Sequence, residues 1–210
     1  MERWTAVAFV FAGFLRVAGA QTTLTVRIYN PAHVSPNTLV KVRDEAAYIL
    51  RSAGIRTAWV TCTNPGECPK PASVLDVVVR LAPDSVFPKQ DTAHRRILGR
   101  AVTGYGKVAD YVEVYYAPIR KLVSETQMAS SADVIGAVIA HEVGHLFLGS
   151  GHSGSGLMRG CWSPRELALL ARRKLIFDQV EKVELKRQYI LHRPPRQQEA
   201  GVLARNQIGW

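Results

Sequence analysis

The chain has 210 residues and a net charge of +10, enough sequence for one domain with a hydrophobic core. The charge favours association with anionic surfaces or polymers. No nucleic-acid-binding motif is present, and the basic residues are spread along the chain instead of alternating with aromatic ones, so we expect no nucleic-acid partner.

The first 20 residues have the pattern of a secretory signal peptide. Arg3 precedes an apolar stretch over residues 6–15, and the small residues 18–20 form a cleavage site before Gln21. The apolar stretch is shorter than the roughly 20 residues of a transmembrane helix, and no later segment reads as apolar enough to span a membrane. The sequence therefore predicts a secreted or periplasmic mature protein without a membrane span.

Five segments have the alternating or β-branched pattern of strands. They lie at 23–29, 55–61, 74–81, 97–103 and 110–117. The third is apolar on both faces, as expected for a central strand. Helices are expected from Ser35 to Gly54, after the first strand, and at 119–127, after the last.

The chain has three cysteines. Cys62 and Cys68 flank the turn-forming sequence TNPGE, so an oxidising compartment favours a disulfide between them. Zinc ligation by this pair is the alternative, although no second pair follows at zinc-finger spacing. Cys161 is left as a buried thiol, a partner for one of the other two, or a reactive thiol.

The apolar run 132–148 contains the sequence HEVGH, an HExxH motif. Apolar residues recur at helical spacing along the run, and either of the two serines before it can cap the helix. His141 and His145 are four residues apart, so on a helix both imidazoles face one side and can ligate one metal ion. Glu142 flanks this pair and can take a proton from a metal-bound water.

The residues after this helix extend the motif. Gly149 permits a sharp turn, His152 follows three residues later, and Met158 follows six residues after that. The run 141–152 resembles the zinc-binding sequence of the metzincin metallopeptidases and is similar to that of uncharacterised secreted bacterial proteins classed with them. Here the glycine and the last histidine each fall one residue later than in the usual metzincin spacing.

The resemblance implies a role for each residue of the motif. The zinc ligands would be His141, His145 and His152, with Glu142 as general base and Met158 in a methionine turn beneath the metal. It also implies an α+β, zincin-like fold. We expect a mixed, twisted sheet of about five strands with an amino-terminal helix, an active-site helix and a long carboxyl-terminal helix. The strand at 97–103 would be the sheet edge above the cleft, where an extended peptide can bind as an added strand.

The long carboxyl-terminal helix is expected to begin after Ser163 with a capping box and to run to about Leu191. A proline pair ends it, and the polar segment 193–210 is expected to be a flexible tail. The predicted organisation is therefore a signal peptide at 1–20, a single zincin-like catalytic domain at 21–192, and this tail.

Glu166 is an alternative third zinc ligand. It lies 21 residues after His145, and the thermolysin-like zincins take their third ligand, a glutamate, from a helix at a similar distance. The surrounding sequence does not match that family, and a capping box with Ser163 already accounts for this glutamate. His152 is therefore the preferred third ligand.

Together these features predict a secreted zinc metalloendopeptidase with one zinc ion per chain and a peptide or protein substrate. A zinc-bound water would hydrolyse the peptide bond, with Glu142 as general base. Two alternatives remain open. One is a non-catalytic secreted binding protein with a closed zinc site of four protein ligands. The other is a zinc hydrolase that acts on a non-peptide amide or ester.

Overall fold

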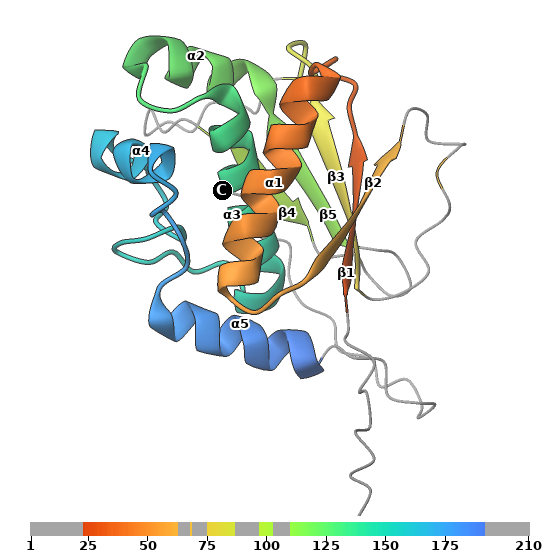
Figure 1. Cartoon of the computed structure of the whole chain (residues 1–210), viewed down its shortest axis with the longest axis vertical. Helices are drawn as coiled ribbons and strands as arrows, with labels where there is room; N and C mark the ends of the chain where they lie inside the picture. Colours follow the sequence, from red (N-terminus) through yellow and green to blue (C-terminus); the bar gives the residue numbers. More distant parts are fainter. Residues whose placement is uncertain (1–22, 63–67, 69–74, 87–96, 103–109, 192–210) are drawn as a thin grey trace, which may run out of the picture.

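The computed structural model describes residues 23–62, 68, 75–86, 97–102 and 110–191 (Figure 1). The predicted signal peptide and the predicted tail at 193–210 lie outside the described residues.

The fold is built on a mixed five-stranded sheet with the strand order β2-β1-β3-β5-β4. The first four strands in this order are parallel, and β4 pairs with β5 in the antiparallel direction. Strand β4 forms one edge of the sheet, as predicted. The strands are β1 (Leu24–Tyr29), β2 (Thr57–Cys62), β3 (Asp76–Ala82), β4 (Gly99–Val102) and β5 (Asp110–Tyr115).

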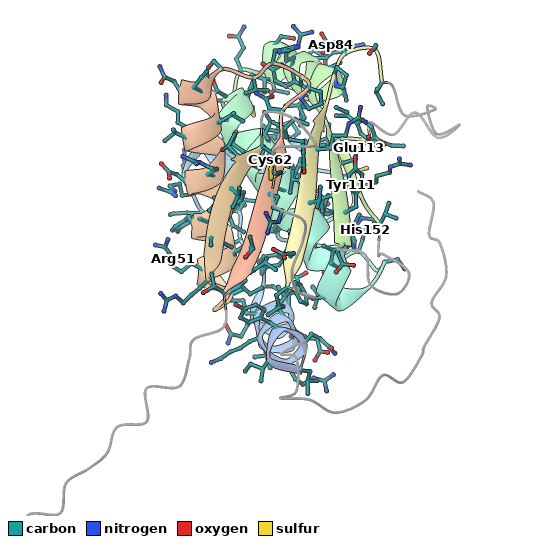
Figure 2. The ribbon with its side chains drawn as sticks, turned by 90° about the vertical axis from the view of Figure 1, so that its right-hand side faces the viewer. Arg51, Cys62, Asp84, Tyr111, Glu113 and His152 are labelled. Atoms are coloured by element: carbon teal, nitrogen blue, oxygen red, sulfur yellow. A yellow bond between two sulfur atoms is a disulfide. The ribbon has the colours of Figure 1, made fainter. Side chains whose placement is uncertain are left out.

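In the described part of the chain, five helices accompany the sheet, which gives the predicted α+β class. Helices α1 and α3 pack against each other and against the sheet (Figure 1), whereas the opposite sheet face is turned to the viewer in Figure 2. The helices are α1 (Pro36–Ser52), α2 (Tyr116–Thr126), α3 (Ser131–Leu148), α4 (Pro164–Ala171) and α5 (Gln179–Leu191).

The hydrophobic core lies between the sheet and these helices. Alternation along β1, β3 and β5 sends apolar side chains to the helical face, and the apolar stripe of α1 closes the core. Fully buried members from four elements include Val26, Val79, Ile49, Ile135 and Ile139.

Helix α3 runs through the middle of this core. Ser130 caps it, and its hydroxyl and the Asp133 carboxylate form a capping box. By length and hydropathy α3 could span a membrane, contrary to the expectation that no segment after residue 20 is apolar enough, but 72% of it is buried in the fold. That burial is typical of a core helix.

The predicted long carboxyl-terminal helix is wrong in one respect, because the structure divides it into α4 and α5. Between them Arg173 adopts a left-handed backbone conformation, with φ of 55°. Leu175 and Phe177 then insert into the core, each 1% exposed. A capping box of its own starts α5: the Glu181 N–H donates to Asp178 Oδ1 at 2.8 Å, and the Asp178 N–H donates to Glu181 Oε2 at 2.7 Å.

The cysteines are arranged as the sequence favours. Cys62, at the end of β2, forms a disulfide with Cys68, and their Cα atoms are 5.4 Å apart. Cys161 is a free, exposed thiol. It is therefore neither buried nor paired with the other two.

Helices α1 and α3 are in close backbone contact at Gly136, and this contact gives a test of the core. A Cβ atom there would lie 2.9 Å from the Val42 carbonyl oxygen and 3.1 Å from the Ala46 nitrogen, both backbone atoms. We expect Gly136→Ala to lower the free energy of unfolding by about 1–3 kcal/mol, because the helices must separate. Gly154→Ala, which meets nothing within 4 Å, is the control and should change stability little. Denaturant unfolding measures both, and a Gly136→Ala protein as stable as wild type would contradict this packing.

Candidate metal centre

Two elements bring three histidines together. Helix α3 supplies His141 and His145, which are buried, and the loop after it supplies His152, which is exposed. One ring nitrogen from each lies within 4.8 Å of the other two, and the Nε2 atoms of the helical pair are 3.0 Å apart. This is the only such group of potential ligands among the described residues.

Backbone carbonyls orient the two helical imidazoles. Nδ1 of His141 lies 2.8 Å from the Leu157 oxygen, and Nδ1 of His145 lies 2.8 Å from the Gly149 oxygen. A carbonyl only accepts, so each Nδ1 carries the proton and each Nε2 keeps its lone pair. Two lone pairs 3.0 Å apart repel each other unless a cation lies against both. The donor set therefore fits a metal ion such as zinc.

Burial also keeps these imidazoles neutral. It lowers the pKa of His141 to about 3, with a further lowering by the neighbouring His145. It lowers the pKa of His145 to about 4 in the same way, against the hydrogen bond to Gly149. Neutral imidazole is the form that binds metals, so protons do not compete for these nitrogens near neutral pH.

His152 is positioned by a glycine that the sequence reasoning did not single out. A Cβ atom at Gly160 would lie 3.1 Å from Cγ of His152, so the absence of a side chain leaves room for the imidazole. The His152 ring is 5.5 Å from that of His141 and 4.9 Å from that of His145, measured between centroids.

Met158 lies under α3 at the middle of the HEVGH sequence. Its side chain is 1% exposed, and its Sδ lies 2.6 Å from the place where a Cβ of Gly144 would be. The glycine thus lets the methionine pack directly on the helix backbone between the two histidines. The preceding residue, Leu157, accepts hydrogen bonds from His141 and from Trp162 Nε1, the latter at 3.1 Å.

The loop that carries His152 is hydrogen-bonded to α5. The hydroxyl of Ser153 donates to Glu181 Oε1, and the Ser153 N–H donates to the Met158 oxygen at 2.9 Å. Glu181 is also the capping residue of α5 and is 7% exposed. A serine followed 28 residues later by a glutamate has no sequence signature, so this link was not predicted.

Glu142 is a buried carboxylate next to the edge strand. It is 4% exposed, and its Oε2 has no hydrogen-bond partner in the described part of the chain. Burial raises its pKa to about 8, against a hydrogen bond from the Ala101 backbone of β4. A carboxylate with a free oxygen and a pKa near neutrality is suited to accept and return a proton.

The Glu166 carboxylate forms hydrogen bonds outside the histidine group. Its Oε2 accepts from the Ser163 N–H at 2.8 Å and from Arg159 at 2.9 Å, as the carboxylate of the predicted capping box. It is not part of the three-histidine group.

The raised pKa of Glu142 predicts a pH-dependent stability difference in the metal-free protein. Between its ordinary value of 4.5 and about 8, the folded protein holds a proton that the unfolded chain has released, so stability falls as pH rises through this window. Glu142→Gln does not titrate. After chelation we expect the free energy of unfolding of Glu142→Gln to exceed that of wild type by on the order of 4 kcal/mol at pH 8 and to differ little near pH 4.5. Denaturant unfolding at several pH values tests this, and a difference independent of pH would contradict it.

The Ser153–Glu181 contact predicts an effect on metal affinity. Ser153→Ala removes one hydrogen bond that holds the loop of the third histidine, so we expect zinc to bind about fivefold more weakly, the equivalent of about 1 kcal/mol. Ser153→Thr keeps the hydroxyl and should bind zinc as wild type does. Competition with a chromophoric chelator measures all three proteins. Equal affinities for the alanine and threonine variants would show that the contact does not support the site.

Comparison with protein-family models and with curated proteins gives no match. Among solved structures, the chain is similar to a zinc-dependent peptidase from Methanocorpusculum labreanum, with 18% identity and a TM-score of 0.49, over 76% of this chain and 99% of that one. It is also similar to archaemetzincin from Methanopyrus kandleri, with 13% identity and a TM-score of 0.46, over 79% of this chain and 95% of that one.

Proposed function

We propose that this protein is a secreted zinc metalloendopeptidase of the metzincin type. The observation that carries the proposal is the convergence of two neutral, carbonyl-oriented imidazoles with a third histidine, beside a buried carboxylate on the same helix. His141, His145 and His152 would hold one zinc ion. With three protein ligands, the fourth position stays open, as in catalytic zinc sites.

Glu142 is the general base in this proposal. Zinc bound by the three histidines would supply Lewis acidity, which polarises a carbonyl group and makes water acidic enough to lose a proton near pH 7. Glu142 accepts that proton on its unpartnered Oε2 and returns it to the leaving amine. Its burial excludes competing water from the carboxylate, and its position on α3 fixes it relative to the two helical ligands.

The edge strand favours a peptide as the substrate. Strand β4 leaves one side of its backbone unpaired by the sheet, so an extended peptide can add to it through main-chain hydrogen bonds. A non-peptide amide or ester lacks these repeating backbone groups. The alternative of a closed, non-catalytic zinc site needs a fourth protein ligand. Among the described residues, neither Glu166 nor Cys161 belongs to the histidine group.

Two features support secretion. The signal-peptide pattern at 1–20 predicts export, and the Cys62–Cys68 disulfide suits an oxidising compartment.

The proposal predicts that Glu142→Gln separates zinc binding from turnover. The three ligands remain, so the variant should hold about one zinc per chain, whereas loss of the base should lower cleavage of an unstructured protein by about 10²–10⁴-fold. Elemental analysis and mass spectrometry of the products measure the two quantities.

Glu166→Gln is the matched control, because it makes the same change at another buried glutamate and keeps a residue that suits a capping box. It should retain both zinc and turnover. Undiminished cleavage by Glu142→Gln would overturn the role of Glu142, and loss of zinc from Glu166→Gln would make Glu166 a ligand.

A further inference from the structure

Strand β4 presents different residues to the two faces of the sheet. A Cβ atom at Gly99 would lie 2.7 Å from Val138 Cγ1 and 3.0 Å from Glu142 Oε1, so Gly99 faces α3. Arg100, the next residue, faces the other way and pairs in register with Glu113 of β5. Glu113 is labelled in Figure 2 on the sheet face turned to the viewer.

The hydrogen-bond pattern shows which backbone groups of β4 point away from β5, toward the open edge of the sheet. Tyr115 N–H donates to the Leu98 oxygen at 2.9 Å, so alternation in the antiparallel ladder directs Arg100 toward β5 and directs Gly99 and Ala101 outward. The outward N–H of Ala101 accordingly meets the carboxylate of Glu142. A peptide added to this edge therefore passes the proposed general base while it lies beside Arg100.

The ion pairs around Glu113 leave positive charge at this position. Glu113 is 4% exposed, and its Oε1 accepts from Arg80 at 2.8 Å. Its Oε2 lies 3.0 Å from Arg100 Nη2 and accepts from Tyr115 Oη at 3.0 Å. Two guanidinium groups thus share one carboxylate. The side chain of Arg100 is 51% exposed, so it is held in place by Glu113 and still reachable from solvent.

We propose that Arg100 selects peptides that carry an acidic side chain at the position beside it, close to the cleaved bond. This rests on the proposed function. Residues that pair across two neighbouring strands project from the same face of the sheet. If the peptide runs antiparallel to β4, the residue opposite Arg100 forms a non-hydrogen-bonded pair with it. Side chains approach each other most closely in pairs of this kind. The guanidinium donates two parallel hydrogen bonds to a carboxylate, which a neutral side chain accepts less well.

The test uses a series of peptides in which a single glutamate moves along an otherwise uncharged sequence. Zinc-loaded wild type should cleave best when the glutamate occupies one fixed position relative to the cut, by about fivefold over the matching glutamine peptide, as expected for one cross-strand ion pair. Arg100→Gln should lose this preference. In this variant Glu113 is still hydrogen-bonded to Arg80 and Tyr115, so its carboxylate is not left without partners. Arg100→Lys should keep most of it. Arg120→Gln, which removes an equally exposed, ion-paired arginine from α2, should behave as wild type.

A second measurement separates this inference from the proposed function. Fluorescence anisotropy reports binding of the same peptides to Glu142→Gln and to the double variant with Arg100→Gln, without any cleavage. Arg100-dependent binding of the acidic peptides, with no cleavage by wild type, would uphold the inference and overturn the peptidase assignment. Cleavage with an acidic preference that survives Arg100→Gln, or with no preference in wild type, would overturn the inference alone.

Discussion

The carbonyl oxygen of Leu157 is the contact on which the rest of the site depends. This oxygen accepts hydrogen bonds from His141 and from Trp162, so one backbone group fixes the tautomer of a proposed ligand on α3 and the course of the chain after Met158. Leu157 is itself fully buried, and its N–H donates to the Ile176 oxygen between α4 and α5. The ligand geometry is therefore set by the hydrophobic core and not by the surface loop alone.

Because the site is buried in this core, its polar groups lower the stability of the fold in the absence of metal. His141, Glu142 and His145 are themselves buried, on a helix whose other core-facing residues are apolar. Two lone pairs face each other, and one carboxylate oxygen lacks a partner. Metal binding offsets these unfavourable terms, so the free energy of zinc binding also stabilises the fold. Functional sites commonly lower the stability of the fold in this way.

Local sequence patterns predicted most of the elements and the three histidines that the fold brings together, but not the contacts that position them. Strand alternation, the Ser130 cap and the HEVGH spacing are each contained in a few residues. The break at Arg173 was missed although Asp178 and Glu181 carry a capping-box pattern, because the apolar spacing continues across it. The helix expected at 119–127 begins earlier, at Tyr116, because Pro118 lies in the first turn of α2, where a missing N–H costs little. The Ser153–Glu181 and Arg100–Glu113 contacts join segments that are distant in the sequence. No local sequence pattern predicts such a contact.

X-ray absorption at the zinc edge of the reconstituted protein tests whether three histidines hold one zinc ion and leave a position open for chemistry. We expect three nitrogen neighbours at about 2.0–2.1 Å and one exchangeable oxygen, without sulfur. Zinc that fails to bind, or a closed shell of four protein ligands that includes the Cys161 sulfur, would contradict this expectation.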